Sequence, residues 1–190
     1  MAHRVQYRNK VTVLLLLMFM IMACNNNPAK TDRVAMSDVN LRQREGTLYL
    51  KGAPFTGMTF ELYDNGDTAK TSAYQNGKQH GLTRWWYPNK QLAQNRIFVN
   101  GWKQGIHKGW WPNGKLQFEY HFTNDEYEGE ITEWFSNGKV FRIFHYAAGH
   151  EAGRQKMWWE DGKIRANYVI IKGEKFGLFG QKLCVNDIKS

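Results

Sequence analysis

Short runs of apolar and aromatic residues recur along the chain, and a turn signal of Asn, Asp and Gly separates each pair of runs. Glycines stand 24 residues apart from Gly57 to Gly177. Two aromatic columns keep the same spacing: Leu62, Trp86, Trp110, Trp134 and Trp158, and the residues that follow them, Tyr63, Tyr87, Trp111, Phe135 and Trp159. Such self-similarity is typical of a repeat protein in which each unit packs on its neighbours.

Each unit predicts a β-hairpin, because two extended runs flank one turn. Pro88 and Pro112 indicate the type of turn, since proline in a paired strand would remove a ladder hydrogen bond. We therefore expect a three-residue Pro-Asn-Gly loop whose glycine adopts the left-handed conformation. Lys90 replaces that glycine in one unit, at an expected cost of about 1 kcal/mol.

A loop of this length sets the register of the two strands around it. The register predicts that the Trp86 column lies on an aromatic and aliphatic face, and that the Tyr87 column lies on a more polar face. The expected cross-strand pairs in one unit are Trp134 with Val140, Thr132 with Arg142 and Glu130 with Phe144.

The sequence thus predicts an all-β fold, an elongated single-layer antiparallel sheet of stacked β-hairpin repeats of 24 residues. About five and a half units are expected over residues 46–184, before a C-terminal tail at residues 185–190. With so few residues no second layer would fully cover the apolar face, which favours an interaction surface.

The first residues resemble a bacterial lipoprotein signal. A basic segment precedes an apolar run that is short for a membrane span, and Ile21 to Cys24 (IMAC) resembles a lipobox. The resemblance implies a signal peptide at residues 1–23 and acyl chains such as palmitate on Cys24, which anchor an outer-membrane lipoprotein facing the periplasm or the cell surface. An uncleaved anchor and an ordinary signal peptide are the alternatives. Residues 24–45 are mostly polar with weak periodicity and predict a lipid-anchored tether.

The repeat columns, as in GKQHGLTRWWYPNKQLAQNRIFVNG at residues 77–101, resemble the MORN-repeat variant of the bacterial YwqK-type antitoxin family. The resemblance covers residues 45–182, and residues 48–78 are similar to the opening unit of that family. It implies a hairpin-repeat sheet that contacts proteins or membranes. Taken literally, the family label would imply an immunity role, but a lipoprotein address fits poorly with neutralising a cytoplasmic toxin.

No residue pattern predicts catalysis. There is no GxSxG motif, and although His121 and His145 share one column, no third ligand converges on them. We therefore expect no enzyme activity, no metal and no cofactor. Cys184 is left as a buried thiol, an intermolecular disulfide or a metal contact.

The net charge of +9 is spread along the chain and attracts phosphates without specificity, while the predicted compartment disfavours nucleic acid. The main hypothesis is a lipid-anchored cell-envelope scaffold that binds a protein partner. The alternative is a glycan- or membrane-surface-binding module. The candidate binding surface is the second aromatic column with its neighbouring lysines: Tyr87, Trp111, Phe135, Trp159, Lys115, Lys139 and Lys163.

Overall fold

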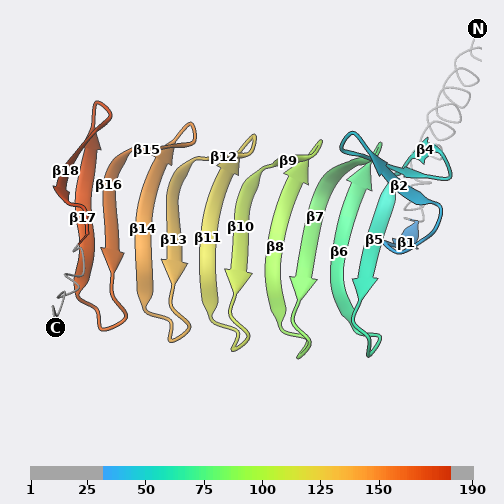
Figure 1. Cartoon of the computed structure of the whole chain (residues 1–190), viewed down its shortest axis with the longest axis horizontal. Helices are drawn as coiled ribbons and strands as arrows, with labels where there is room; N and C mark the ends of the chain where they lie inside the picture. The colour runs from blue at the N-terminus through green and yellow to red at the C-terminus, as the bar shows by residue number, and fades with distance from the viewer. Residues whose placement is uncertain (1–31, 181–190) are drawn as a thin grey trace, which may run out of the picture. The chain divides into compact units, whose positions relative to one another are not determined.

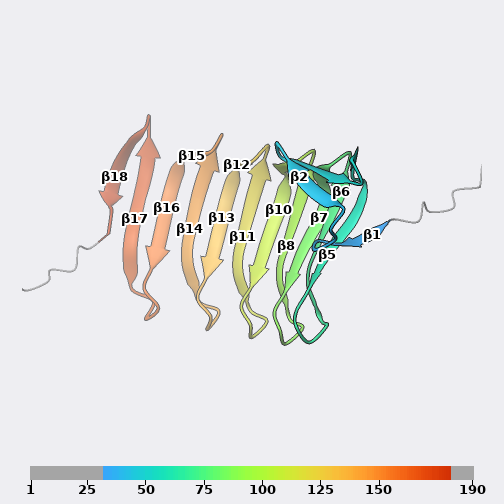
Figure 2. The ribbon, with the colours of Figure 1, turned by 45° about the vertical axis from the view of Figure 1, so that its right-hand side comes forward.

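The computed structural model describes residues 32–180, and within that range the strands form a fifteen-stranded and a three-stranded sheet. The hairpins lie side by side in one row (Figure 1), and the turned view still shows a single layer of strands (Figure 2). The predicted all-β sheet of stacked hairpins is confirmed. No helix in the described range is long and apolar enough to cross a membrane.

Five hairpins make up the row in the described residues, each one repeat of the sequence pattern. They are β5 (Gly57–Leu62) with β6 (Thr68–Gln75), β7 (Lys78–Trp86) with β8 (Leu92–Val99), β10 (Gly105–Trp110) with β11 (Leu116–Thr123), β13 (Gly129–Trp134) with β14 (Val140–Ala147), and β16 (Gly153–Trp158) with β17 (Ile164–Ile171). The short strands β9 (Trp102–Lys103), β12 (Glu126–Tyr127) and β15 (His150–Glu151) each pair with the strand before them, and β18 (Glu174–Leu178) pairs with β17.

The loop inside each hairpin has the predicted three-residue form. In β7–β8 the Tyr87 N–H donates to the Gln91 carbonyl at 2.8 Å, and the Lys90 N–H donates to the Tyr87 carbonyl at 2.9 Å. Lys90 has φ of 67° and Gly114, its counterpart in the next hairpin, has φ of 81°. A lysine therefore occupies a left-handed position that favours glycine.

The predicted register is right beside the loop and wrong beyond it. Trp134 pairs with Val140 as expected, but the next pair is Glu133 with Arg142, because Phe141 forms a β-bulge. Thr132 and Glu130 consequently lie opposite Ile143 and His145, not opposite Arg142 and Phe144. The sequence prediction assumed regular strands, and one extra residue moves every later side chain to the other face. The other four hairpins carry the same irregularity.

Because of the bulge, the two aromatic columns do not share a face with the strand residues predicted to lie beside them. Side chains alternate along a strand, so Trp134 lies on the opposite face from Glu133 and Ile131. We call the face that holds the row's buried side chains the aromatic face; it includes Phe98, Phe118, Phe122, Ile131, Phe144 and Tyr168. The Tyr87 column follows the Trp86 column by one residue and belongs to the aromatic face. The prediction that it lies on the more polar face is therefore wrong.

The three-stranded sheet lies at the β5 end of the row, where both views show it in blue (Figures 1 and 2). It consists of β2 (Leu41–Arg44), β3 (Thr47–Leu50) and β4 (Ala53–Pro54). Leu41, Leu48 and Phe55 form a buried cluster against which Tyr74 of β6 packs. The Leu48 N–H also donates to the Gly77 carbonyl at 2.8 Å, so this small sheet caps the first hairpin.

The chain before the repeats is more ordered than predicted. In the range predicted to be a tether, β1 (Arg33–Ala35) pairs in parallel with β5, and Leu41 is buried in the cap. Two stretches of the predicted tether, Arg33–Ala35 and Leu41–Arg44, are therefore strands, and the row of five repeat hairpins starts at Gly57. Strands of three or four residues are too short to show a clear alternation in sequence. The predicted signal peptide, Cys24, Cys184 and residues 185–190 lie outside the described residues.

Candidate binding site

The predicted aromatic column runs beside the three-residue loops, and its four members are half-buried. The Tyr87 hydroxyl donates to the Trp110 carbonyl at 2.9 Å, and Trp111 Nε1 donates to the Trp134 carbonyl at 3.0 Å. These polar atoms tie each hairpin to the next. A ligand that covers the rings would therefore leave those two donors satisfied.

The three lysines of the predicted surface are exposed at the loops. Lys115 Nζ donates to the Asn137 carbonyl at 2.7 Å, and Lys139 Nζ donates to the Glu160 carbonyl at 3.0 Å, each in the next loop along the row. Lys163 instead pairs with the carboxylate of Asp161 at 3.1 Å. The lysines form a basic rim whose ammonium groups already have partners.

A ladder of asparagines, which the sequence analysis left without a role, joins the same loops. Asn89 and Asn113 each donate from Nδ2 to a carbonyl of the next loop, at 3.1 and 2.8 Å. Each also accepts, on Oδ1, the N–H of the residue two positions later. The regular spacing of the asparagines was the only sign of this ladder in the sequence.

A hollow of about 290 Å³ opens on the aromatic face between the third hairpin, β10–β11, and the fourth, β13–β14. Two members of the predicted column, Trp111 and Phe135, line it, whereas Tyr87 and Trp159 do not. The structure thus brings together two of the four predicted aromatic residues at one site. The full lining is Trp111, Gln117, Phe118, Tyr120, Glu133, Trp134, Phe135 and Phe141.

Gly109 in β10 makes room for Phe118, one of the rings that line the hollow. The column that holds Gly109 carries Trp85, Glu133 and Met157 in other hairpins. A Cβ atom on Gly109 would lie 2.1 Å from Cε1 of Phe118, so the Phe118 ring occupies the space of the missing side chain. Phe118 pairs with Glu133 of β13, so this ring lies between Gly109 and the carboxylate at the hollow.

Glu133 is the charged centre of the hollow. Its Oε1 accepts hydrogen bonds from the Tyr120 hydroxyl and from Arg142 Nη2, both at 2.5 Å, and its side chain is only 16% exposed. Burial, followed by the hydrogen bond to Glu133, raises the pKa of Tyr120, so this phenol stays a protonated donor. Within residues 32–180, Oε2 of Glu133 makes no hydrogen bond, so a half-satisfied carboxylate lies among aromatic rings.

Arg142, the cationic partner of Glu133, also contacts an aromatic ring. Burial alone would lower the pKa of Arg142, but its hydrogen bond and charge interaction with Glu133 outweigh burial and raise it. The Arg142 guanidinium also lies 5.1 Å from the centroid of the Phe144 ring. The ion pair is thus held in one geometry, which pre-orients the carboxylate.

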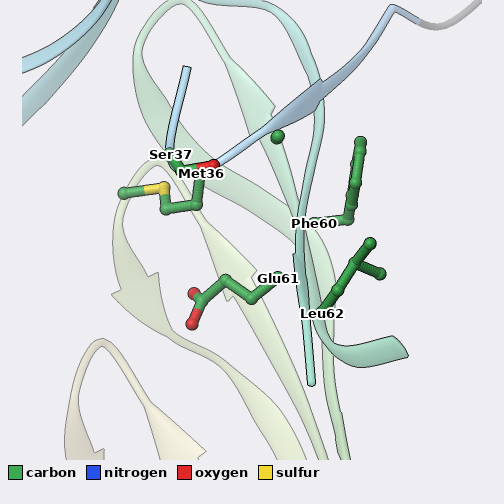
Figure 3. A pocket seen from close by; sticks show the side chains of 6 residues that line it. Met36, Ser37, Phe60, Glu61 and Leu62 are labelled. Carbon is green, nitrogen blue, oxygen red and sulfur yellow. The ribbon is translucent and has the colours of Figure 1, made fainter. Parts of the chain in front are cut away.

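A second hollow, of about 470 Å³, lies at the β1 and β5 edge of the sheet (Figure 3). Figure 3 shows Glu61 on one side of β5 and Phe60 and Leu62 on the other, so this space wraps around an open strand edge. The pairing of β1 with β5 stops at Phe60, which leaves the end of β5 uncovered on that side. We therefore regard the hollow at Glu133 as the better candidate site.

The histidines have structural surroundings. Nε2 of His107, which is 1% exposed, lies 2.8 Å from the carbonyl oxygen and 3.2 Å from the nitrogen of Ile97. His121 and His145 each lie 3.3 Å from a carboxylate, of Glu119 and Glu130 respectively. In the described range no three metal-ligating side chains gather in one place.

Comparison with known proteins finds matches to a repeat family in the central part of the chain. Residues 79–100, 103–124 and 127–148 each match the family described as MORN repeat variant. These matches run from β7 to β14, and every residue that lines the hollow falls within them. No curated protein matches the chain.

Proposed function

We propose that this chain, which carries three MORN repeat variants, is a non-catalytic binding module that acts as a scaffold for a protein partner. The observation that supports this proposal is the aromatic face. Its central rings, including the stacked pair Phe118 and Tyr120 with centroids 4.4 Å apart, lie on a one-layer sheet beside a hollow.

Several properties of this face suit a protein interface. Aromatic residues and arginine are enriched in the centres of such interfaces, and both kinds meet here at Trp111, Phe135 and Arg142. Their side chains are held by contacts within the sheet, so a partner would lose little conformational entropy in ordering them.

We further propose that acyl chains on Cys24 hold the module at a bacterial envelope, as an outer-membrane lipoprotein. The IMAC sequence at residues 21–24 supports this proposal. Cells grown with labelled palmitate should incorporate label into the wild-type chain, and Cys24→Ser should abolish that incorporation. Equal labelling of both chains would overturn the anchoring proposal.

The scaffold proposal is tested by affinity capture. The tagged full-length protein is mixed with detergent-solubilised envelope from its native host, and retained proteins are identified by mass spectrometry. We expect one protein in stoichiometric amount, lost with Trp111→Ala and kept with Trp110→Ala, a neighbour on the opposite face. Capture that both variants keep would place the interface elsewhere, and the absence of a stoichiometric protein would overturn the scaffold role.

A second candidate function is the binding of a glycan or a membrane surface through the same rings and lysines. The hollow favours a glycan over a membrane, because a carboxylate among aromatic rings offers a hydrogen-bond acceptor to hydroxyl groups. If the Trp111→Ala variant is retained on a glycan resin as strongly as the wild type, glycan binding through these rings is contradicted.

A further inference from the structure

We infer that the hollow between the third and fourth hairpins is a subsite for one sugar ring of an uncharged glycan. This inference rests on the second candidate function above and adds to it the place, size and charge of the ligand. Neither the scaffold role nor the membrane anchor is needed for it to hold. The hollow lies where β11 and β13 run side by side (Figure 1).

The size of the hollow limits the ligand. A volume of about 290 Å³ is at the low end of the range for ligand pockets, and it suits one six-membered ring. A helix or a folded protein loop is larger. A polymer could still continue past the site along the aromatic face, with one unit in the hollow.

The walls of the hollow offer ring faces to a sugar. Trp111, Phe135 and Phe141 line it, and the rings of Phe135 and Phe141 lie 5.1 Å apart at an angle of 59°. The C–H faces of a pyranose are apolar and its hydroxyl groups point outward from the ring edge. An aromatic wall can therefore cover the sugar face while the hydroxyls reach polar groups.

Two polar groups are available for those hydroxyls. Glu133 has its Oε2 without a hydrogen bond in the described range, and the Gln117 side chain has none there either. A carboxylate accepts hydroxyl hydrogen bonds more strongly than a neutral acceptor does, and the Gln117 amide both donates and accepts. Together they match the mixed donors and acceptors of a sugar.

The charge balance argues for an uncharged ligand. Aromatic rings around a carboxylate would suit a cation, but Arg142 already neutralises Glu133 at 2.5 Å, and Lys115 and Lys139 stand in the neighbouring loops. An anion would meet Glu133 itself, while the two lysines already bind carbonyl oxygens. A charged ligand of either sign would therefore find no unpaired side chain of opposite charge among these residues.

The test measures binding of oligosaccharides to the purified full-length protein in a sugar-free detergent. The probes are maltotetraose, the tetramer of N-acetylglucosamine and the tetramer of galacturonic acid, and the readouts are tryptophan fluorescence and calorimetry. We expect at least one uncharged tetramer to bind, about tenfold more weakly with Gln117→Leu and with Trp111→Ala. Trp110→Ala is the matched control, since it truncates a tryptophan on the opposite face, outside the hollow, and should leave the affinity unchanged.

Gln117→Leu guards against misfolding as an explanation, because the Gln117 side chain supports no hydrogen bond in the described range. Failure of both uncharged tetramers to bind would overturn the inference, as would binding of the acidic tetramer alone. Binding that Gln117→Leu and Trp111→Ala leave unchanged would move the subsite elsewhere and equally overturn it. Protein capture by the scaffold experiment together with no saccharide binding would separate the two proposals.

Discussion

At the scale of the residue, the absence of a side chain at Gly109 determines where the Phe118 ring packs in the third hairpin. Phe118 occupies the position that a Cβ on Gly109 would need, with its Cε1 only 2.1 Å from that point. Gly109 does not require a left-handed backbone, so alanine would be strained there only by its contact with the ring. A glycine in a column of larger residues thus marks, in the sequence, the place where the Phe118 ring packs.

Gly109→Ala should lower the free energy of unfolding by about 1–3 kcal/mol, because Phe118 must leave its place over β10. Urea unfolding followed by tryptophan fluorescence measures the change. The double variant with Phe118→Leu should recover part of the loss, since a smaller side chain removes the clash. Strictly additive effects of the two substitutions would contradict the proposed contact.

Lys90→Gly should raise the free energy of unfolding by about 0.5–1 kcal/mol, because Lys90 holds φ of 67° in the loop. The ion pair of Lys90 with Asp67 is largely exposed and should offset little of that gain. The reverse change in the next hairpin, Gly114→Lys, should lower stability by a similar amount. Thermal melts of the two variants check both signs, and equal melting temperatures would refute the strain.

At the scale of the element, two of the described hairpins each bury one polar side chain that bonds to the strand beside it. Gln155 accepts the His145 N–H on Oε1 at 2.9 Å and donates from Nε2 to the His145 carbonyl at 2.8 Å. His107 takes the same place two repeats earlier, against Ile97. Glutamine and neutral histidine therefore do the same structural work, but only histidine can gain a charge.

The stability of the protein should accordingly fall in mild acid because of His107. Burial lowers the pKa of His107 below its ordinary value of about 6.5, so the unfolded chain binds a proton more readily. The free energy of unfolding should then be unaffected by this residue above about pH 6.5 and should decrease below it. His107→Gln should reduce that decrease, as measured by urea unfolding at pH 7.5 and pH 5. Gln155→His should add to it, and identical pH profiles for all three chains would contradict the prediction.

The limits of sequence reasoning also lie at the element scale. The proline and glycine positions fixed the loop correctly, and the pair Trp134–Val140 followed from it. The bulge at Phe141 left no mark in the sequence, because any residue can be the extra one in a β-bulge. The face assignment of the Tyr87 column failed for that reason, and the hollow at Glu133 could not be foreseen without it.

At the scale of the molecule, the 24-residue period was enough to predict a row of hairpins, since each unit needs only its neighbours to bury its face. The cap was not foreseen, because it consists of strands of two to four residues and belongs to no repeat. Its core, Leu41, Leu48 and Phe55, closes one end of the row. At the other end β18 pairs with β17 alone within the described residues.

Because each hairpin contacts only the adjacent strands, a destabilising substitution should lower stability mainly near its own position in the row. Leu48→Ala, at a position 3% exposed, should weaken the cap by about 2–5 kcal/mol, whereas Ile131→Ala, 2% exposed in β13, should weaken the centre of the row. Native-state hydrogen exchange should then quicken in β1 to β5 for Leu48→Ala, with the amides of β16 and β17 almost unchanged. The Ile131 variant should quicken exchange on both sides of β13. If Leu48→Ala instead speeds exchange in β16 and β17 as much as in β5, the sheet unfolds as one cooperative unit, and a ligand at the hollow would stabilise the cap as strongly as its own hairpins.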